Sequence, residues 1–131
     1  MKHGGILTLT LVLTMGVAVA LSGGEGKTIE GTLVDTKCYS MDARNVSNDH
    51  VTPKGTLPKC ATACANMGIP VAILTAGGKV YTLAVPAGQV ANHMAKQARA
   101  TGMVKGRILL AEKLQVKEGN TWKEVNIATM M

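Results

Sequence analysis

Three cysteines and one histidine are the residues whose types and spacing suit chemistry in this chain: Cys38, His50, Cys60 and Cys64. Cys60 and Cys64 are four residues apart, so on a helix they share one face. Ala63 and Met67 fall near that face, which predicts that it points into the protein. Three thiolates and an imidazole suit a soft or borderline ion, zinc or copper(I). The spacing C-x21-C-x3-C is not a zinc-finger pattern, so the residue types alone predict the metal site.

Two other arrangements of the same cysteines fit the sequence. In the first, Cys38 forms a disulfide with Cys60 or Cys64, which pins the loop between them and leaves one buried thiol. Closing a loop of that length stabilises a fold by about 3 kcal/mol in the chain-entropy model. A bridge between Cys60 and Cys64 fits disulfide geometry poorly, because both lie on one helix. In the second arrangement, the C-x3-C pair supports thiol redox chemistry or copper delivery, since Cys60 lies near a predicted helix N-terminus.

The first 26 residues have the pattern of an export signal followed by a linker, so they are not expected to be part of the folded domain. A short basic start, Met1 to His3, precedes sixteen uncharged residues, Ile6 to Leu21, and the run contains Ala18-Val19-Ala20. This pattern is typical of a secretory signal peptide, residues 1–20, cleaved after Ala20; an uncleaved N-terminal anchor is the alternative. Residues 21–26 form a Gly-rich linker, and residues 27–131 form one domain. We therefore expect a periplasmic or secreted protein, in which disulfides persist.

Hydrophobic periodicity predicts the elements that must position these residues. Residues 27–35 alternate between apolar and polar and predict a strand, and residues 39–57 predict a long loop. A helix over 58–67 starts at a proline and stops at Gly68. Residues 70–75 and 79–85 flank Ala76-Gly77-Gly78 and predict a hairpin. A second helix over 89–99 and strands over 101–112, 113–117 and 121–127 follow, the last two joined by a turn at 118–120.

This order of elements resembles an oligonucleotide/oligosaccharide-binding (OB) barrel. We therefore expect a mainly β fold with two short helices, a five- to six-stranded OB-like barrel. The segments G-T-L-V-D-T-K-C at 31–38, C-A-T-A-C-A at 60–65, G-I-P-V at 68–71 and A-R-A-T-G at 98–102 resemble a group of small exported bacterial proteins. The resemblance implies the OB-like fold and an important role for the cysteines, and brings no catalytic motif with it.

Composition narrows the class of protein. The chain has 131 residues and a net charge of +6 without a basic run, so it is one domain without a polybasic arm. It has no G-x-S-x-G elbow and no phosphate-binding glycine loop, so we expect a non-enzymatic protein. Nucleic-acid binding is not expected, because the predicted strands carry too few aromatics. The alternative is a module that binds a protein or glycan partner through Tyr81 or Trp122. His93 is expected to face solvent.

Overall fold

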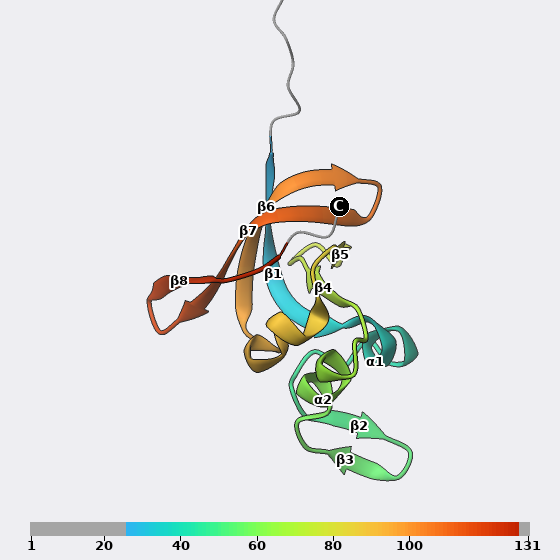
Figure 1. The fold of residues 1–131 in the computed structure, drawn as a ribbon. Helices are drawn as coiled ribbons and strands as arrows, with labels where there is room; N and C mark the ends of the chain where they lie inside the picture. Colours follow the sequence, from blue (N-terminus) through green and yellow to red (C-terminus); the bar gives the residue numbers. More distant parts are fainter. Residues whose placement is uncertain (1–25, 129–131) are drawn as a thin grey trace, which may run out of the picture.

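The computed structural model describes residues 26–128, which form a curved six-stranded sheet with an insertion of two short helices and a hairpin at one end (Figure 1). In chain order the elements are β1 (Lys27–Asp35), α1 (Thr36–Met41), β2 (His50–Thr52), β3 (Gly55–Leu57), α2 (Cys60–Asn66), β4 (Val71–Leu74), β5 (Val80–Leu83), the 3-10 turns η1 (Ala87–Gln89) and η2 (Ala91–His93), β6 (Gln97–Lys105), β7 (Ile108–Glu118) and β8 (Thr121–Val125). The predicted signal peptide and nearly all of the linker lie outside the described residues. No helix within residues 26–128 is long and apolar enough to cross a membrane.

The sheet closes into a ring-like, barrel-like arrangement. Its strand order is β5-β4-β1-β6-β7-β8, and β5 also pairs in parallel with β7. Strand β1 pairs with β6 through its first half and with β4 through its second half. The change of partner brings the backbones so close that a Cβ on Gly31 would lie 2.0 Å from the Leu74 carbonyl oxygen, so only glycine fits. The predicted mainly β, OB-like fold is confirmed.

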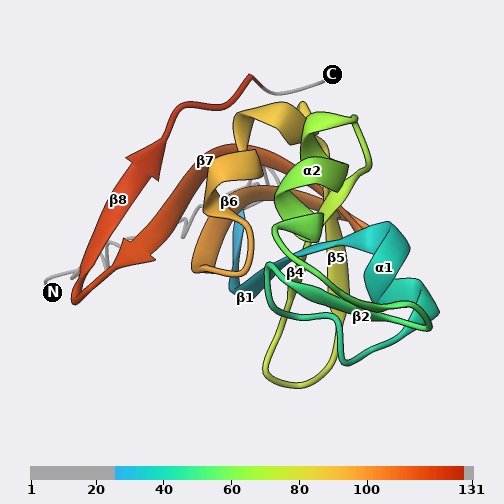
Figure 2. The same cartoon turned by 90° about the horizontal axis from the view of Figure 1, so that it is seen from below.

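The core lies inside the curve of the sheet and contains no phenylalanine. Its largest fully buried apolar side chains are Leu33, Ile73, Leu109 and Leu114, and alanines fill much of the remaining space. Ala61 and Ala65 of α2 are buried in the same hydrophobic core, so this face of α2 packs against the barrel. Figure 2 shows α2 beside the 3-10 turns at one end of the sheet.

Most predicted elements are present, but the predicted helix over 89–99 is wrong. The segment contains the end of η1 and the whole of η2, and β6 already begins at Gln97. Two observations explain the difference. Ala95 has a left-handed φ of 66°, which ends any helix there, and Leu33 exchanges backbone hydrogen bonds with Ala95 and Lys96. The buried positions Ala98, Ala100 and Gly102 then alternate as in a strand. The apolar residues of this segment fit both the spacing of a helix and the alternation of a strand. Backbone pairing with β1 favours the strand.

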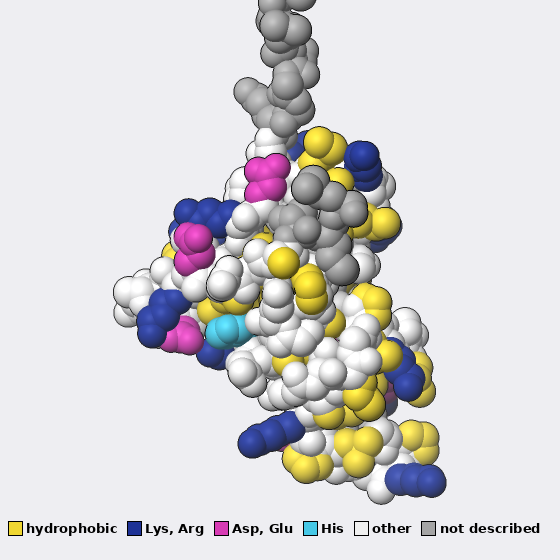
Figure 3. Space-filling model, in the orientation of Figure 1, with side chains coloured by type: hydrophobic (Ala, Val, Ile, Leu, Met, Phe, Trp, Pro, Cys, Tyr) yellow, Lys and Arg dark blue, Asp and Glu magenta, His cyan; other side chains and the backbone are white. Residues whose placement is uncertain are grey.

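Two further boundaries differ from the predictions. The predicted strand over 101–112 is split by a turn at Gly106, which has a φ of 60°, so β6 and β7 form a long hairpin. The predicted loop over 39–57 contains the end of α1 and the β2–β3 hairpin. At the bottom of Figure 3, where the β2–β3 hairpin lies, apolar side chains are exposed and basic side chains flank them. Val51 and Leu57 are two exposed apolar residues of this hairpin.

Candidate metal site

The insertion between β1 and β4 carries all three cysteines and His50. It starts where Asp35, the last residue of β1, caps α1: its carboxylate oxygen Oδ1 accepts a hydrogen bond of 2.8 Å from the Cys38 backbone N–H. Aspartate is a favoured N-cap because its side chain satisfies a free N–H of the first turn. The cap fixes Cys38 in α1, directly beyond the end of β1.

Two asparagines fasten the loop that carries His50. The buried Asn45 side chain donates to the Cys38 carbonyl oxygen at 3.3 Å and accepts from the Val51 backbone N–H at 3.0 Å, which ties α1 to β2. The Asn48 side chain accepts from the Thr62 backbone N–H at 3.0 Å and so caps α2 from the loop. His50 therefore lies between α1 and α2, within reach of both.

Helix α2 supplies the other two thiols. Its buried residues are Ala61, Cys64 and Ala65, and Cys60 is half-buried. The prediction that Ala63 and Met67 mark the inward face is wrong, because Ala63 is exposed and Met67 is 71% exposed. The inward stripe passes through Ala61 and Ala65 instead, and Cys64 lies on it. Cys60 lies at its edge, where its sulfur reaches Cys38.

The sulfur and nitrogen atoms of the cluster lie at metal-binding distances. The Cys38 and Cys60 sulfurs are 3.9 Å apart, close to the edge of about 3.8 Å expected for two thiolates at 2.3 Å from a tetrahedral ion. Cys38, His50 and Cys60 place their ligand atoms within 4.8 Å of one another, and so do Asp35, Cys38 and Cys64. Cys38 belongs to both groups. The five side chains therefore lie close enough to hold a metal ion.

Asp35 and His50 show the clearest need for a partner. Their side chains are 0% and 1% exposed, and His50 Nε2 lies 3.4 Å from Asp35 Oδ2 without forming a hydrogen bond. Of four buried side-chain nitrogen and oxygen atoms without a hydrogen-bond partner in the described chain, three belong to this pair: Asp35 Oδ2, His50 Nδ1 and His50 Nε2. Buried polar atoms are rarely left unpaired, because each costs about 1–3 kcal/mol. An ion bound by the imidazole removes that cost.

The pKa values of two of the thiols, Cys38 and Cys64, are raised. Burial, the negative charge of Asp35 and the neighbouring Cys60 thiol together raise the pKa of Cys38 to about 12. Burial and the charge of Asp35 also raise the pKa of Cys64. A cation has the opposite effect, because thiolates are the form that coordinates a metal. An ion bound here would therefore displace the thiol protons, and the negative charge of Asp35 would favour the cation.

None of the cysteines is paired in a disulfide. The distance of 3.9 Å between the Cys38 and Cys60 sulfurs is nearly twice the S–S bond length of about 2.05 Å. The expectation of a disulfide-pinned loop is therefore not met in this structure. Hydrogen bonds from Asn45 and Asn48 hold the loop instead.

Compared with models of known protein families, with curated protein sequences and with solved structures, the chain has no match. The chemical interpretation of the site therefore rests on its own geometry.

The other residues singled out in the sequence lie away from the cluster. Tyr81 is half-buried and packs against the core. Trp122 is half-buried on β8, with the Arg99 guanidinium carbon 4.4 Å from its ring centre. His93 was expected to face solvent, but it is half-buried, and burial and Lys96 lower its pKa. The partner-binding role of Tyr81 and Trp122 stays a prediction.

Sequence reasoning missed three residues of the site: Asp35, Asn45 and Asn48. Asp35 was interpreted only as the end of a strand, although aspartate three residues before Cys38 is also a helix N-cap signal. The asparagines act through contacts over seven and fourteen residues, and no local pattern reveals such contacts.

We expect Asp35→Asn to weaken zinc or copper(I) binding by about 10- to 100-fold, the usual cost of losing a carboxylate that supports a metal-bound histidine. Asparagine is an equally good N-cap, so α1 keeps its start and the loss reflects the missing negative charge. Competition with a chromophoric chelator measures the affinity. Glu112→Gln is the matched control, because it removes one negative charge from an exposed side chain of β7, outside the insertion. Equal affinities for the two variants would contradict a role for Asp35.

Proposed function

We propose that this is a small metal-binding protein whose insertion holds one soft or borderline ion, zinc or copper(I). Cys38, Cys60, Cys64 and His50 are the proposed ligands, and Asp35 supports His50 or the ion itself. A Cys3His set is a known ligand combination for structural zinc, and thiolates also select copper(I).

The observation that carries the proposal is the buried His50 ring. Both of its nitrogens lack hydrogen-bond partners, and they lie beside two thiols and a carboxylate. A histidine retained only to pair with Asp35, whose Oδ2 lies 3.4 Å from Nε2, still leaves Nδ1 unpaired at a cost in stability. A histidine that binds an ion through one nitrogen and turns the other toward a carboxylate satisfies both atoms.

A binding role accounts for this cluster better than thiol catalysis does. Cysteine, histidine and aspartate also occur together in thiol hydrolases, where the base activates the thiolate. In this cluster the pKa of Cys38 is raised to about 12, so its thiol is a poor nucleophile at neutral pH. His50 is 1% exposed, which leaves a substrate no access to the ring.

Export to the periplasm or the cell exterior is part of the proposal and rests on residues 1–20 of the sequence. In an oxidising compartment free thiols are converted to disulfides unless something protects them. A bound ion would keep three neighbouring thiolates reduced, which fits an odd number of cysteines.

Native mass spectrometry combined with thiol counting tests this function. After addition of one equivalent of zinc(II) or copper(I), we expect one ion per chain and three cysteines that resist alkylation. After removal of the ion by a chelator, all three are expected to react. A purified protein with one disulfide, one free thiol and no affinity for either ion would overturn the proposal.

A further inference from the structure

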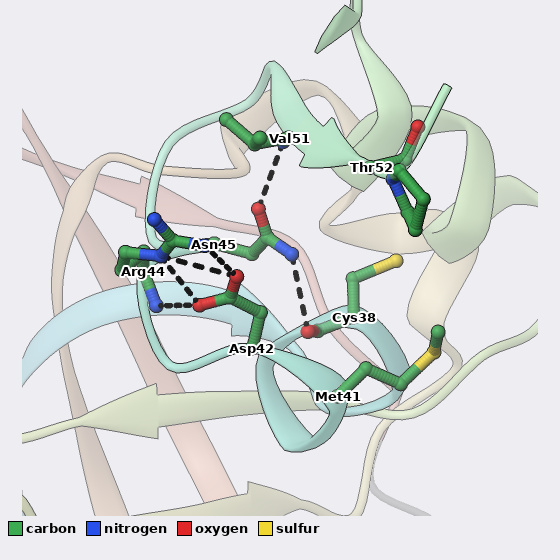
Figure 4. Close-up of a pocket in the computed structure, with 8 residues that line it drawn as sticks. Cys38, Met41, Asp42, Arg44, Asn45, Val51 and Thr52 are labelled. Carbon is green, nitrogen blue, oxygen red and sulfur yellow. Dashed lines mark hydrogen bonds and ion pairs between the residues drawn. The ribbon is translucent and has the colours of Figure 1, made fainter. Parts of the chain in front are cut away.

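A hollow of about 360 Å³ opens beside the cluster, between α1 and the start of the β2–β3 hairpin (Figure 4). Its lining residues come from the chain around Cys38 and the chain around Val51: Cys38, Met41, Asp42, Arg44, Asn45, Val51, Thr52 and Pro53. Its walls are largely apolar. It therefore offers a small ligand or an ion a place to bind beside the cluster.

Cys38 connects this hollow to the proposed metal site. Among the five cluster residues, Cys38 is the one that also lines the hollow. His50, Cys64 and Asp35 are buried, with exposed fractions of 5% or less. An ion that arrives through the hollow therefore meets the Cys38 sulfur before the other ligands.

Met41 places a second sulfur atom in the same hollow. It follows Cys38 by three residues on α1, so the two side chains share one face of the helix. Figure 4 shows both sulfurs on the same side of α1, with that of Cys38 directed toward Thr52. Met41 is 75% exposed, so its thioether is free to meet an incoming ion.

The charges on the wall cancel each other. Asp42 is the one acid among the lining residues, and Arg44 holds it through both carboxylate oxygens, at 3.0 Å from Nε to Oδ1 and 2.7 Å from Nη2 to Oδ2. A hard divalent cation therefore finds no free carboxylate there. The soft donors among the lining side chains are the Met41 thioether and the Cys38 thiol, and sulfur ligands select soft ions such as copper(I).

We propose that this hollow is the loading site for copper(I), where the Met41 thioether captures the ion and passes it to Cys38 and the buried cluster. The proposal rests on the proposed function and adds the identity of the ion and its route. The step is a ligand exchange without electron transfer: a bond from copper to the Met41 sulfur breaks, a bond to the Cys38 sulfur forms, and the thiol proton leaves to solvent.

The test compares Met41→Leu with Met67→Leu, because leucine conserves the volume of methionine but removes the sulfur. Met67 is 71% exposed, follows the last residue of α2 and does not line the hollow. Copper(I), kept reduced by ascorbate, is transferred from a coloured chelator to the metal-free protein in a stopped-flow instrument. We expect Met41→Leu to slow the transfer by about tenfold, because the capturing thioether ligand is lost. Its equilibrium affinity for copper(I) and its rate of zinc loading stay unchanged, and Met67→Leu behaves as wild type.

The following outcomes would each contradict one of the two proposals. Copper(I) transfer to Met41→Leu at the wild-type rate, or an equal slowing in Met67→Leu, would overturn the loading site and leave the metal-binding function intact. Binding of zinc without binding of copper(I) would also overturn the loading site. A wild-type protein that binds neither ion would overturn the proposed function itself.

Discussion

Cys38→Ser is expected to weaken the binding of zinc and copper(I) by more than the roughly 10- to 100-fold that loss of a supporting carboxylate costs. Cys38 belongs to both groups of ligand atoms in the cluster, so no remaining pair of thiols replaces it. A serine hydroxyl is a hard, neutral ligand and does not coordinate a soft ion as a thiolate does. Chelator competition at pH 7 measures the affinity of each variant.

The loss of affinity for zinc and copper(I) should also depend on which thiol is removed. Cys64→Ser leaves Cys38, Cys60 and His50 together and is expected to lose less affinity than Cys38→Ser. Ala63→Ser is the matched control, because it adds the same hydroxyl to the exposed side of α2 and should bind as wild type. A Cys38→Ser protein that folds, as judged by circular dichroism, and binds as tightly as Ala63→Ser would contradict the proposed ligand set.

The parts of the fold that the sequence predicts well depend on local signals. Alternation places β1 over the predicted residues 27–35, and the Gly77-Gly78 turn joins β4 to β5 as expected. A proline and a glycine bracket α2 within two residues of its bounds. These elements follow from rules that act over a few neighbouring residues, which explains why one sequence suffices for them.

The errors arise where tertiary contacts decide between two local possibilities. The apolar positions near Ala95 and Ala98 suit a helix or a strand, and backbone pairing with Leu33 favours the strand. The candidate site shows the same division. Residue type alone identifies the three cysteines and His50, whereas the contribution of Asp35 requires knowing that β1 ends beside the buried imidazole.

Removal of a bound ion is expected to release α1 and the β2–β3 hairpin while α2 and the barrel stay folded. Helix α1 has no buried residue, all three residues of β3 are exposed, and His50 is the one buried residue of β2. These elements therefore rest on a few hydrogen bonds and on the cluster. By contrast, β1, β6 and β7 contribute fully buried side chains to the core, which does not depend on the ion.

The expected size of this stabilisation by the ion follows from the entropy of loop closure. An ion that joins Cys38 to Cys60 closes a loop with 21 residues between them, which stabilises the closed state by about 3 kcal/mol in the chain-entropy model. At 1.4 kcal/mol per factor of ten, amides between the two cysteines should exchange about 100-fold more slowly with zinc or copper(I) bound. Hydrogen exchange read by mass spectrometry measures this, with peptides from β6 as the internal reference. In Cys38→Ser the ion should protect neither region. If the wild-type insertion exchanges at the same rate with and without the ion, the cluster does not hold the three elements together.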